Sequence, residues 1–155
     1  MPGYDWTRLH AALNDLPAAL LLMAVLFDVL GMINRRESLR AAGFWCLVAG
    51  ALGGGLAGFA GWMAESTAPH DDAAHALMET HETMAWITLG LFGVLAAWRL
   101  LRRVIGRREQ ALFTTTGVIG VALPVYTARL GGELVFEHGV GVHAGPHEAT
   151  EEHHH

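Results

Sequence analysis

Four long apolar stretches, nearly free of charge, constrain this chain more than any other feature of its sequence. They run over residues 16–33, 41–63, 83–101 and 111–128. A helix needs about 20 largely apolar residues to cross the hydrocarbon core of a bilayer, and each stretch is close to that length. Asp28 and Arg99 are the charges inside them, and we expect the Arg99 guanidinium to snorkel to the membrane surface. The sequence therefore predicts an all-α fold, an integral membrane four-helix bundle.

The overall composition is typical of a protein that has lipid as its solvent. Of the 155 residues, 52% are apolar and only 16% are Asp, Glu, Lys or Arg, whereas soluble domains carry about 25% of these charged residues. A single cysteine, Cys46, excludes an internal disulfide framework. The formal net charge of −5 gives no electrostatic case for nucleic acid. The lipid bilayer is the expected surrounding, and nucleic acid is not an expected partner.

The arginines predict how the bundle faces. Short connections between the stretches favour an up-down arrangement of antiparallel neighbours, and positively charged residues gather on the cytoplasmic side of membrane proteins. Eight of the ten arginines lie within 35–40 and 99–108, whereas Arg8 and Arg129 map to the opposite side. We therefore expect both termini outside, on the periplasmic or outer side of an inner (cytoplasmic) membrane. The expected divisions are an outer N-terminal segment (1–15), the four-helix transmembrane domain (16–130) and an outer C-terminal segment (131–155).

Histidines form the most informative pattern in the chain. The three that end it (153–155) resemble a purification tag remnant and are set aside; the other seven all map to the expected outer side. Neutral imidazole is a common ligand of transition metals and of haem iron. His10, His81 and His138 stand near ends of three different helices, which are neighbours in an antiparallel bundle. We predict that these three form a binding site, with helix capping or interhelical hydrogen bonding as the alternative.

Two other polar residues have open interpretations. Asp28 is expensive inside a membrane, so we expect it to face the bundle and to find a partner there. That partner is either a Ser, a Thr or the backbone of another span, or else Asp28 belongs to a proton or ion relay. Arg129 ends the fourth stretch, where it either pairs with Glu133 or clamps an anionic group such as a haem propionate.

Small residues and one proline mark the second and fourth stretches. Seven glycines lie within residues 43–61. Glycine allows helices to approach closely in lipid, and it also leaves room for a flat macrocycle, so both interpretations stay open. Pro124 lacks a backbone N–H, and we expect it to kink the fourth helix.

A closing segment resembles a known family. Residues 131–142 read Gly-Gly-Glu-Leu-Val-Phe-Glu-His-Gly-Val-Gly-Val, and they closely resemble the closing motif of a bacterial four-span membrane family, the domain of unknown function 2231. The opening is similar as well, with His10, Pro17 and the acid Asp28, and so is His81 at the start of the third span. Relatives often carry a further His where this chain has Asp15.

The resemblance covers roughly residues 9–142 and implies a place in membrane electron transfer. Some relatives are fused to Rieske iron–sulfur domains, so a Rieske-type or other electron-transfer protein is the implied redox partner, and a bacterial inner membrane is the implied location.

Three functions follow from these observations. The first is an electron-transfer protein, a b-type cytochrome with haem b near the outer surface. Two of His10, His81 and His138 are its axial ligands, and Arg129 faces a propionate. The second is a zinc or copper site of the same three histidines, with Glu82 or Glu137 as a further ligand. The third is a cofactor-free structural subunit whose glycine-rich span packs against another membrane protein.

Motifs of stand-alone enzymes are missing from the sequence. It contains no HExxH motif, no nucleophile elbow and no phosphate-binding glycine loop. We therefore expect an electron carrier or binding subunit rather than an enzyme with its own catalytic residues. The sequence leaves open whether the chain forms homo-oligomers.

Overall fold

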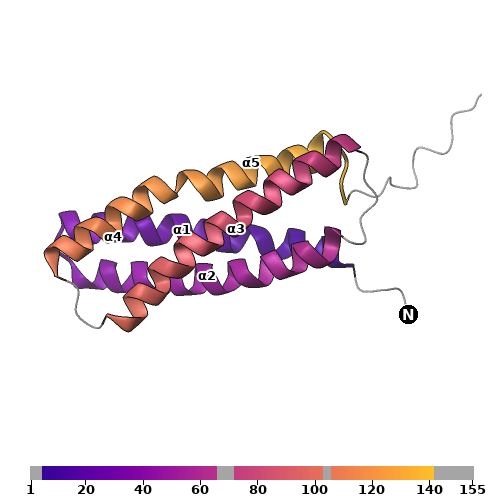
Figure 1. Ribbon diagram of the computed structural model, residues 1–155. Helices are drawn as coiled ribbons and strands as arrows, with labels where there is room; N and C mark the ends of the chain where they lie inside the picture. Colours follow the sequence, from indigo (N-terminus) through magenta and orange to yellow (C-terminus); the bar gives the residue numbers. More distant parts are fainter. Residues whose placement is uncertain (1–4, 66–71, 103–105, 142–155) are drawn as a thin grey trace, which may run out of the picture.

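The computed structural model describes residues 5–65, 72–102 and 106–141, and helices make up most of this part of the chain (Figure 1). The helices are α1 (Trp6–Ile33), α2 (Glu37–Glu65), α3 (Asp72–Leu101), α4 (Arg107–Gly120) and α5 (Ala122–Phe136). Four helical segments are long and apolar enough to cross a membrane: α1, α2, α3 from Ala74 onward, and α4 together with α5. The prediction of an all-α membrane bundle with four spans is confirmed.

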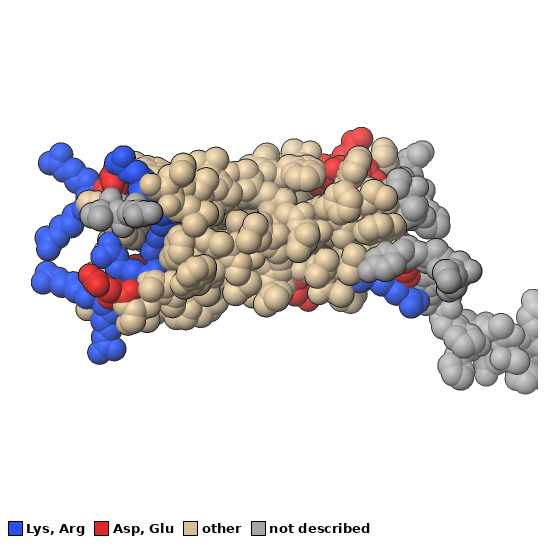
Figure 2. Space-filling model, turned by 90° about the horizontal axis from the view of Figure 1, so that it is seen from below, with Lys and Arg blue, Asp and Glu red and all other residues tan. Residues whose placement is uncertain are grey.

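The two ends of the bundle differ in charge. The α1–α2 connection and the start of α4 lie at one end, and the starts of α1 and α3 lie at the other with the end of α5 (Figure 1). Arginines crowd the first end, and a broad band of uncharged surface separates it from the second (Figure 2). We call the end with Arg35, Arg40 and Arg102 the arginine end, and the end with His10 and His81 the histidine end.

Helix α1 begins at Trp6, well before the apolar stretch that starts at residue 16. The side chain of Asp5 caps it by accepting a hydrogen bond from the backbone N–H of Arg8 at 3.1 Å. With 28 residues, α1 is about 42 Å long, more than the roughly 30 Å of a hydrocarbon core. His10 therefore lies within the helix itself, where its ring has a fixed direction toward the neighbouring helices.

The fourth span is interrupted where the proline predicts it. Helix α4 ends at Gly120 and α5 starts at Ala122, so Val121 joins them three residues before Pro124. Proline has no N–H to donate to the carbonyl of Gly120 and its ring crowds that carbonyl, which breaks the regular ladder. The helix is thus interrupted at the position where the sequence predicts a kink.

Helices α1 and α2 pack closely at Gly50. A Cβ added there would lie 2.9 Å from Cδ2 and 3.2 Å from the backbone N of Leu21, so a larger residue would have to shift these atoms. Leu21, Leu47, Phe92 and Phe113 form the buried apolar cluster between the spans. In lipid such close packing, rather than exclusion of water, holds helices together.

Arg99 does not snorkel to the membrane surface, which corrects our expectation for this residue. Its side chain is only 9% exposed and turns inward, where Nη1 lies 2.5 Å from Oδ2 of Asp28. Nη2 donates to the carbonyl of Arg40 at 2.7 Å, and Cζ lies 5.0 Å from the ring centroid of Phe113. Asp28 faces the bundle as predicted, but its partner is an arginine, because an opposite charge compensates a buried carboxylate better than a hydroxyl does.

The pair makes a testable contribution to stability. Replacing Arg99 by Met leaves the Asp28 carboxylate buried without its counter-charge, and we expect the free energy of unfolding to fall by about 3–5 kcal/mol. Thermal unfolding in detergent, followed by tryptophan fluorescence, measures the change. Arg102→Met is the control, since Arg102 directly follows α3 and its side chain is 56% exposed, so it removes a surface ion pair with Glu109 instead of a buried one. Equal melting temperatures for Arg99→Met and Arg102→Met would show that the buried pair contributes nothing.

Candidate functional site

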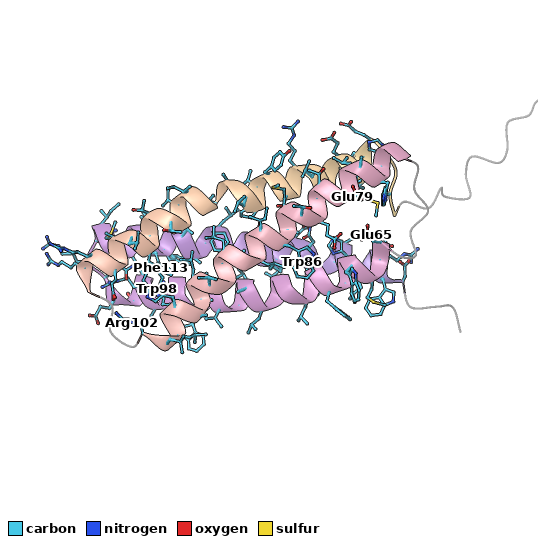
Figure 3. All side chains as sticks on the ribbon, viewed as in Figure 1. Glu65, Glu79, Trp86, Trp98, Arg102 and Phe113 are labelled. Carbon is cyan, nitrogen blue, oxygen red and sulfur yellow. The ribbon has the colours of Figure 1, made fainter. Side chains whose placement is uncertain are left out.

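Two of the three predicted histidines meet at the histidine end of the bundle. His10 comes from α1 and His81 from α3, and their ring centroids lie 6.3 Å apart with the ring planes at 88°. Trp86, five residues after His81 on α3, lies between Glu65 and Glu79 on one side and Phe113 toward the other end (Figure 3). The two spans thus bring one imidazole each to a common place.

Each imidazole is fixed by one backbone carbonyl. Nδ1 of His10 lies 2.8 Å from the carbonyl oxygen of Ala57 on α2, and Nδ1 of His81 lies 3.0 Å from that of Thr127 on α5. A carbonyl oxygen only accepts, so Nδ1 must carry the proton and donate it in both rings. In the neutral ring the lone pair is then on Nε2, which is the arrangement that metal-binding histidines adopt.

A glycine lies against each ring. A Cβ added at Gly61, one turn after Ala57, would lie 2.9 Å from Cε1 and Nδ1 of His10. A Cβ added at Gly131, one turn after Thr127, would lie 3.1 Å from Cε1 of His81. Any larger residue would have to displace the imidazole, so these glycines help to set the ring positions.

The two rings line a cavity of about 490 Å³. Volumes of about 300–1,000 Å³ are usual for sites that bind small molecules and cofactors. Its wall includes Gly58 and Gly61 of the glycine-rich span, which fits the interpretation that these residues leave room for a ligand; others pack helices. Further lining residues are Arg8, Asp15, Trp62, Glu82 and Trp86. A smaller cavity of about 80 Å³ is also lined by both histidines, with Thr88 and Thr127.

The structure does not bring His138 and Arg129 to this pair. His138 lies in an exposed turn after α5 and is not one of the residues that line the cavity. Arg129 is exposed on α5, and among the described residues it forms no ion pair with Glu133. In the part of the chain that the structure describes, no three His, Cys, Asp or Glu residues are grouped so that they could hold a metal ion.

The remaining histidines lie apart from the site or outside the described residues. His75 is exposed near the start of α3, with Nε2 3.5 Å from a carboxylate oxygen of Glu79. His70, His143 and His147 lie outside the described residues, as do the three that end the chain.

Sequence reasoning missed the groups that hold the rings. A backbone carbonyl carries no sequence signature, so Ala57 and Thr127 could not be recognised. Gly131 was seen only as part of a motif, and Gly61 only as one of seven glycines. One signal was available: His10 precedes Gly61 by nearly the same number of residues as His81 precedes Gly131.

Comparison with known proteins identifies one family. The model of a family described as a predicted membrane protein (DUF2231) matches residues 7–144. No curated protein and no solved structure matches the chain. The match includes both histidines, the carbonyls that hold them and the glycines behind them.

The state of the two rings can be measured directly. In protein labelled with ¹⁵N-histidine, we expect NMR to show His10 and His81 protonated at Nδ1 and unprotonated at Nε2, because both Nδ1 atoms donate to carbonyls. Gly61→Ala should shift the His10 resonances, since the new methyl group would overlap the ring. Gly55→Ala is the control, because no atom lies within 4 Å of its added Cβ. Protonation at Nε2 in the wild-type protein, or equal shifts in both variants, would contradict the geometry.

Proposed function

This chain belongs to the DUF2231 family of predicted membrane proteins, and we propose that it is a membrane electron-transfer protein that binds haem b through His10 and His81. One observation carries the proposal. Two imidazoles from different spans lie 6.3 Å apart, edge to face, at the wall of a cavity of ligand size, and each Nδ1 donates to a backbone carbonyl. Both Nε2 lone pairs are thereby left for a ligand.

The spacing of the rings would allow His10 and His81 to hold one iron between them. Imidazoles that bind a metal through Nε2 at about 2.0 Å from opposite sides have ring centroids roughly 6 Å apart. The centroids of His10 and His81 are 6.3 Å apart. The carbonyls of Ala57 and Thr127 supply the backbone partners that such ligands usually have.

A bound haem would supply the one-electron chemistry, and the protein would tune it. Trp62 and Trp86 on the cavity wall would lower the local dielectric, while the carboxylate of Glu82 would favour the more positive, oxidised form of the bound group. Arg8 lines the cavity and Arg129 does not, so Arg8 is better placed to face an anionic edge of the ligand. This assigns to Arg8 the role that the sequence suggested for Arg129.

The charge distribution supports a location for the site. Arginines gather at the arginine end (Figure 2), whereas His10 and His81 belong to the histidine end. From the positive-inside rule we propose that the arginine end faces the cytoplasm and that the histidine end, with the start of α1 and the end of α5, lies on the outer side of a bacterial inner membrane. An electron-transfer protein at that surface, of the Rieske type or another, is the redox partner that we propose.

A spectrum of protein without the terminal histidines tests the proposal. After expression with added haem precursor, we expect the reduced-minus-oxidised spectrum to show the sharp Soret and α-band shifts of six-coordinate haem b. His10→Ala and His81→Ala should each abolish this spectrum, because each removes one axial ligand. His138→Ala is the matched control and should keep it. Thermal unfolding of the haem-free variants shows that they remain folded.

Two results would contradict the proposal in different ways. Stoichiometric zinc or copper without porphyrin absorbance, removed by the same two substitutions, would favour a metal site in place of the haem. Neither haem nor metal in folded protein would favour a structural subunit without a cofactor.

A further inference from the structure

The buried positions of the second half of the chain repeat those of the first. Helices α1 and α2 form one half, and α3 with α4 and α5 forms the other. Each of the seven buried residues of α2, from Gly43 to Ala64, has a buried counterpart 70 residues later in α4 or α5, from Phe113 to Leu134. Thr88, Phe92 and Leu95 of α3 are buried like the α1 residues 71 positions earlier. The two halves therefore share one pattern of buried positions, with an offset of 71 residues between α1 and α3 and of 70 residues between α2 and the fourth span.

Individual contacts repeat with the same register. His10 and Ala57 are 47 residues apart, and His81 and Thr127 are 46 residues apart, and both pairs form the same Nδ1-to-carbonyl hydrogen bond. In both halves a glycine one turn beyond the carbonyl lies against the ring. The two halves thus match in their hydrogen-bonding groups as well as in their buried positions. A chance agreement between two helical burial patterns does not account for this.

Three pairs of counterparts touch each other. Under two-fold symmetry a residue meets its own counterpart only where the axis passes. His10 meets His81, Asp28 meets Arg99 at 2.5 Å, and Arg40 donates from Nη2 to Oε1 of Gln110 at 2.8 Å. The three contacts follow one another from the histidine end toward the arginine end, so they define a line along the bundle.

We infer that the four spans are two copies of one two-helix unit, related by a two-fold axis along the bundle, and that His10 and His81 are the two halves of a single site on this axis. A ligand there meets the same group from either side: an imidazole Nε2, backed by a carbonyl and a glycine. Such a site would suit a metal centre with two coordination positions. This conclusion about the ligand rests on the proposed function, whereas the conclusion about symmetry does not.

The arginine end shows how the two halves became different. Gly43 gives room to the Asp28 carboxylate, since an added Cβ would lie 2.8 Å from Oδ1. Its counterpart is Phe113, whose ring lies under the Arg99 guanidinium. An acid with a glycine in one half thus corresponds to a base with an aromatic ring in the other. Phe44, whose ring centroid lies 5.8 Å from Cζ of Arg99, likewise corresponds to Thr114, which accepts from Gln110 at 3.2 Å.

An exchange of these residues between the halves tests the inference without any ligand. The two-site variant, D28R/R99D, reverses the ion pair but places the new arginine against Gly43 and the new aspartate against the Phe113 ring. The full exchange adds R40Q/Q110R, G43F/F113G and F44T/T114F, so the exchanged ion pair regains the glycine and aromatic neighbours that its groups have in the native protein. Thermal unfolding of the full-length chain in detergent is the measurement.

We expect the two-site variant to melt well below the wild-type protein, and the full exchange to recover at least half of that loss. A full exchange that is no more stable than the two-site variant, including failure of both to fold, would overturn the inference. A second comparison with fewer substitutions remains informative if the larger variants do not fold. In it, R40Q/Q110R should be more stable than Q110R alone. Equal stability of these two would also count against the symmetry. Since neither comparison uses haem, failure here is separate from failure of the proposed function.

Discussion

Inside a bilayer a polar group finds no water, so the buried ion pair and the two imidazoles of this bundle take their partners from other helices. This constraint governs both ends of the protein. At the arginine end the Asp28 carboxylate is 2% exposed and is compensated by Arg99 from a different span. At the histidine end the two imidazoles give their Nδ1 protons to carbonyls of α2 and α5. The spans are thus tied to one another by polar contacts at two depths, with an apolar core between them.

The same contacts that hold the bundle also prepare the site. The carbonyl that accepts from Nδ1 leaves the lone pair on Nε2. One hydrogen bond therefore both gives the imidazole a partner and leaves a ring nitrogen that could bind a ligand. Gly61 and Gly131 let the rings take up their positions, and the Trp62 side of the cavity supplies an apolar wall. A site on a symmetry axis needs only one such arrangement, used twice, which explains why two histidines and not three converge.

The sequence predicted most of the fold because hydropathy and length act within one helix at a time. It identified the four spans, the kink at Pro124 and the inward position of Asp28. The prediction for Arg99 was wrong. A guanidinium near the end of a span can either reach the membrane surface or pair inside the bundle, and the sequence alone does not show which partner the neighbouring span offers. Within the site, His10 and His81 were recognisable as residue types, whereas the carbonyls of Ala57 and Thr127 were not. One signal of the repeat was overlooked. Asp28 and Arg99 are 71 residues apart, which is also the separation of His10 and His81.

The central claim is that one iron takes one imidazole from each half of the bundle, and counting the nitrogens bound to that iron tests it most directly. Pulsed electron paramagnetic resonance on oxidised, haem-loaded protein, with ¹⁵N only in its histidines, separates histidine nitrogens from those of the porphyrin. Two coupled histidine nitrogens in a low-spin ferric centre are the expected result. A high-spin centre with a single histidine nitrogen, or two coupled nitrogens that persist when either His10 or His81 is replaced, would contradict it.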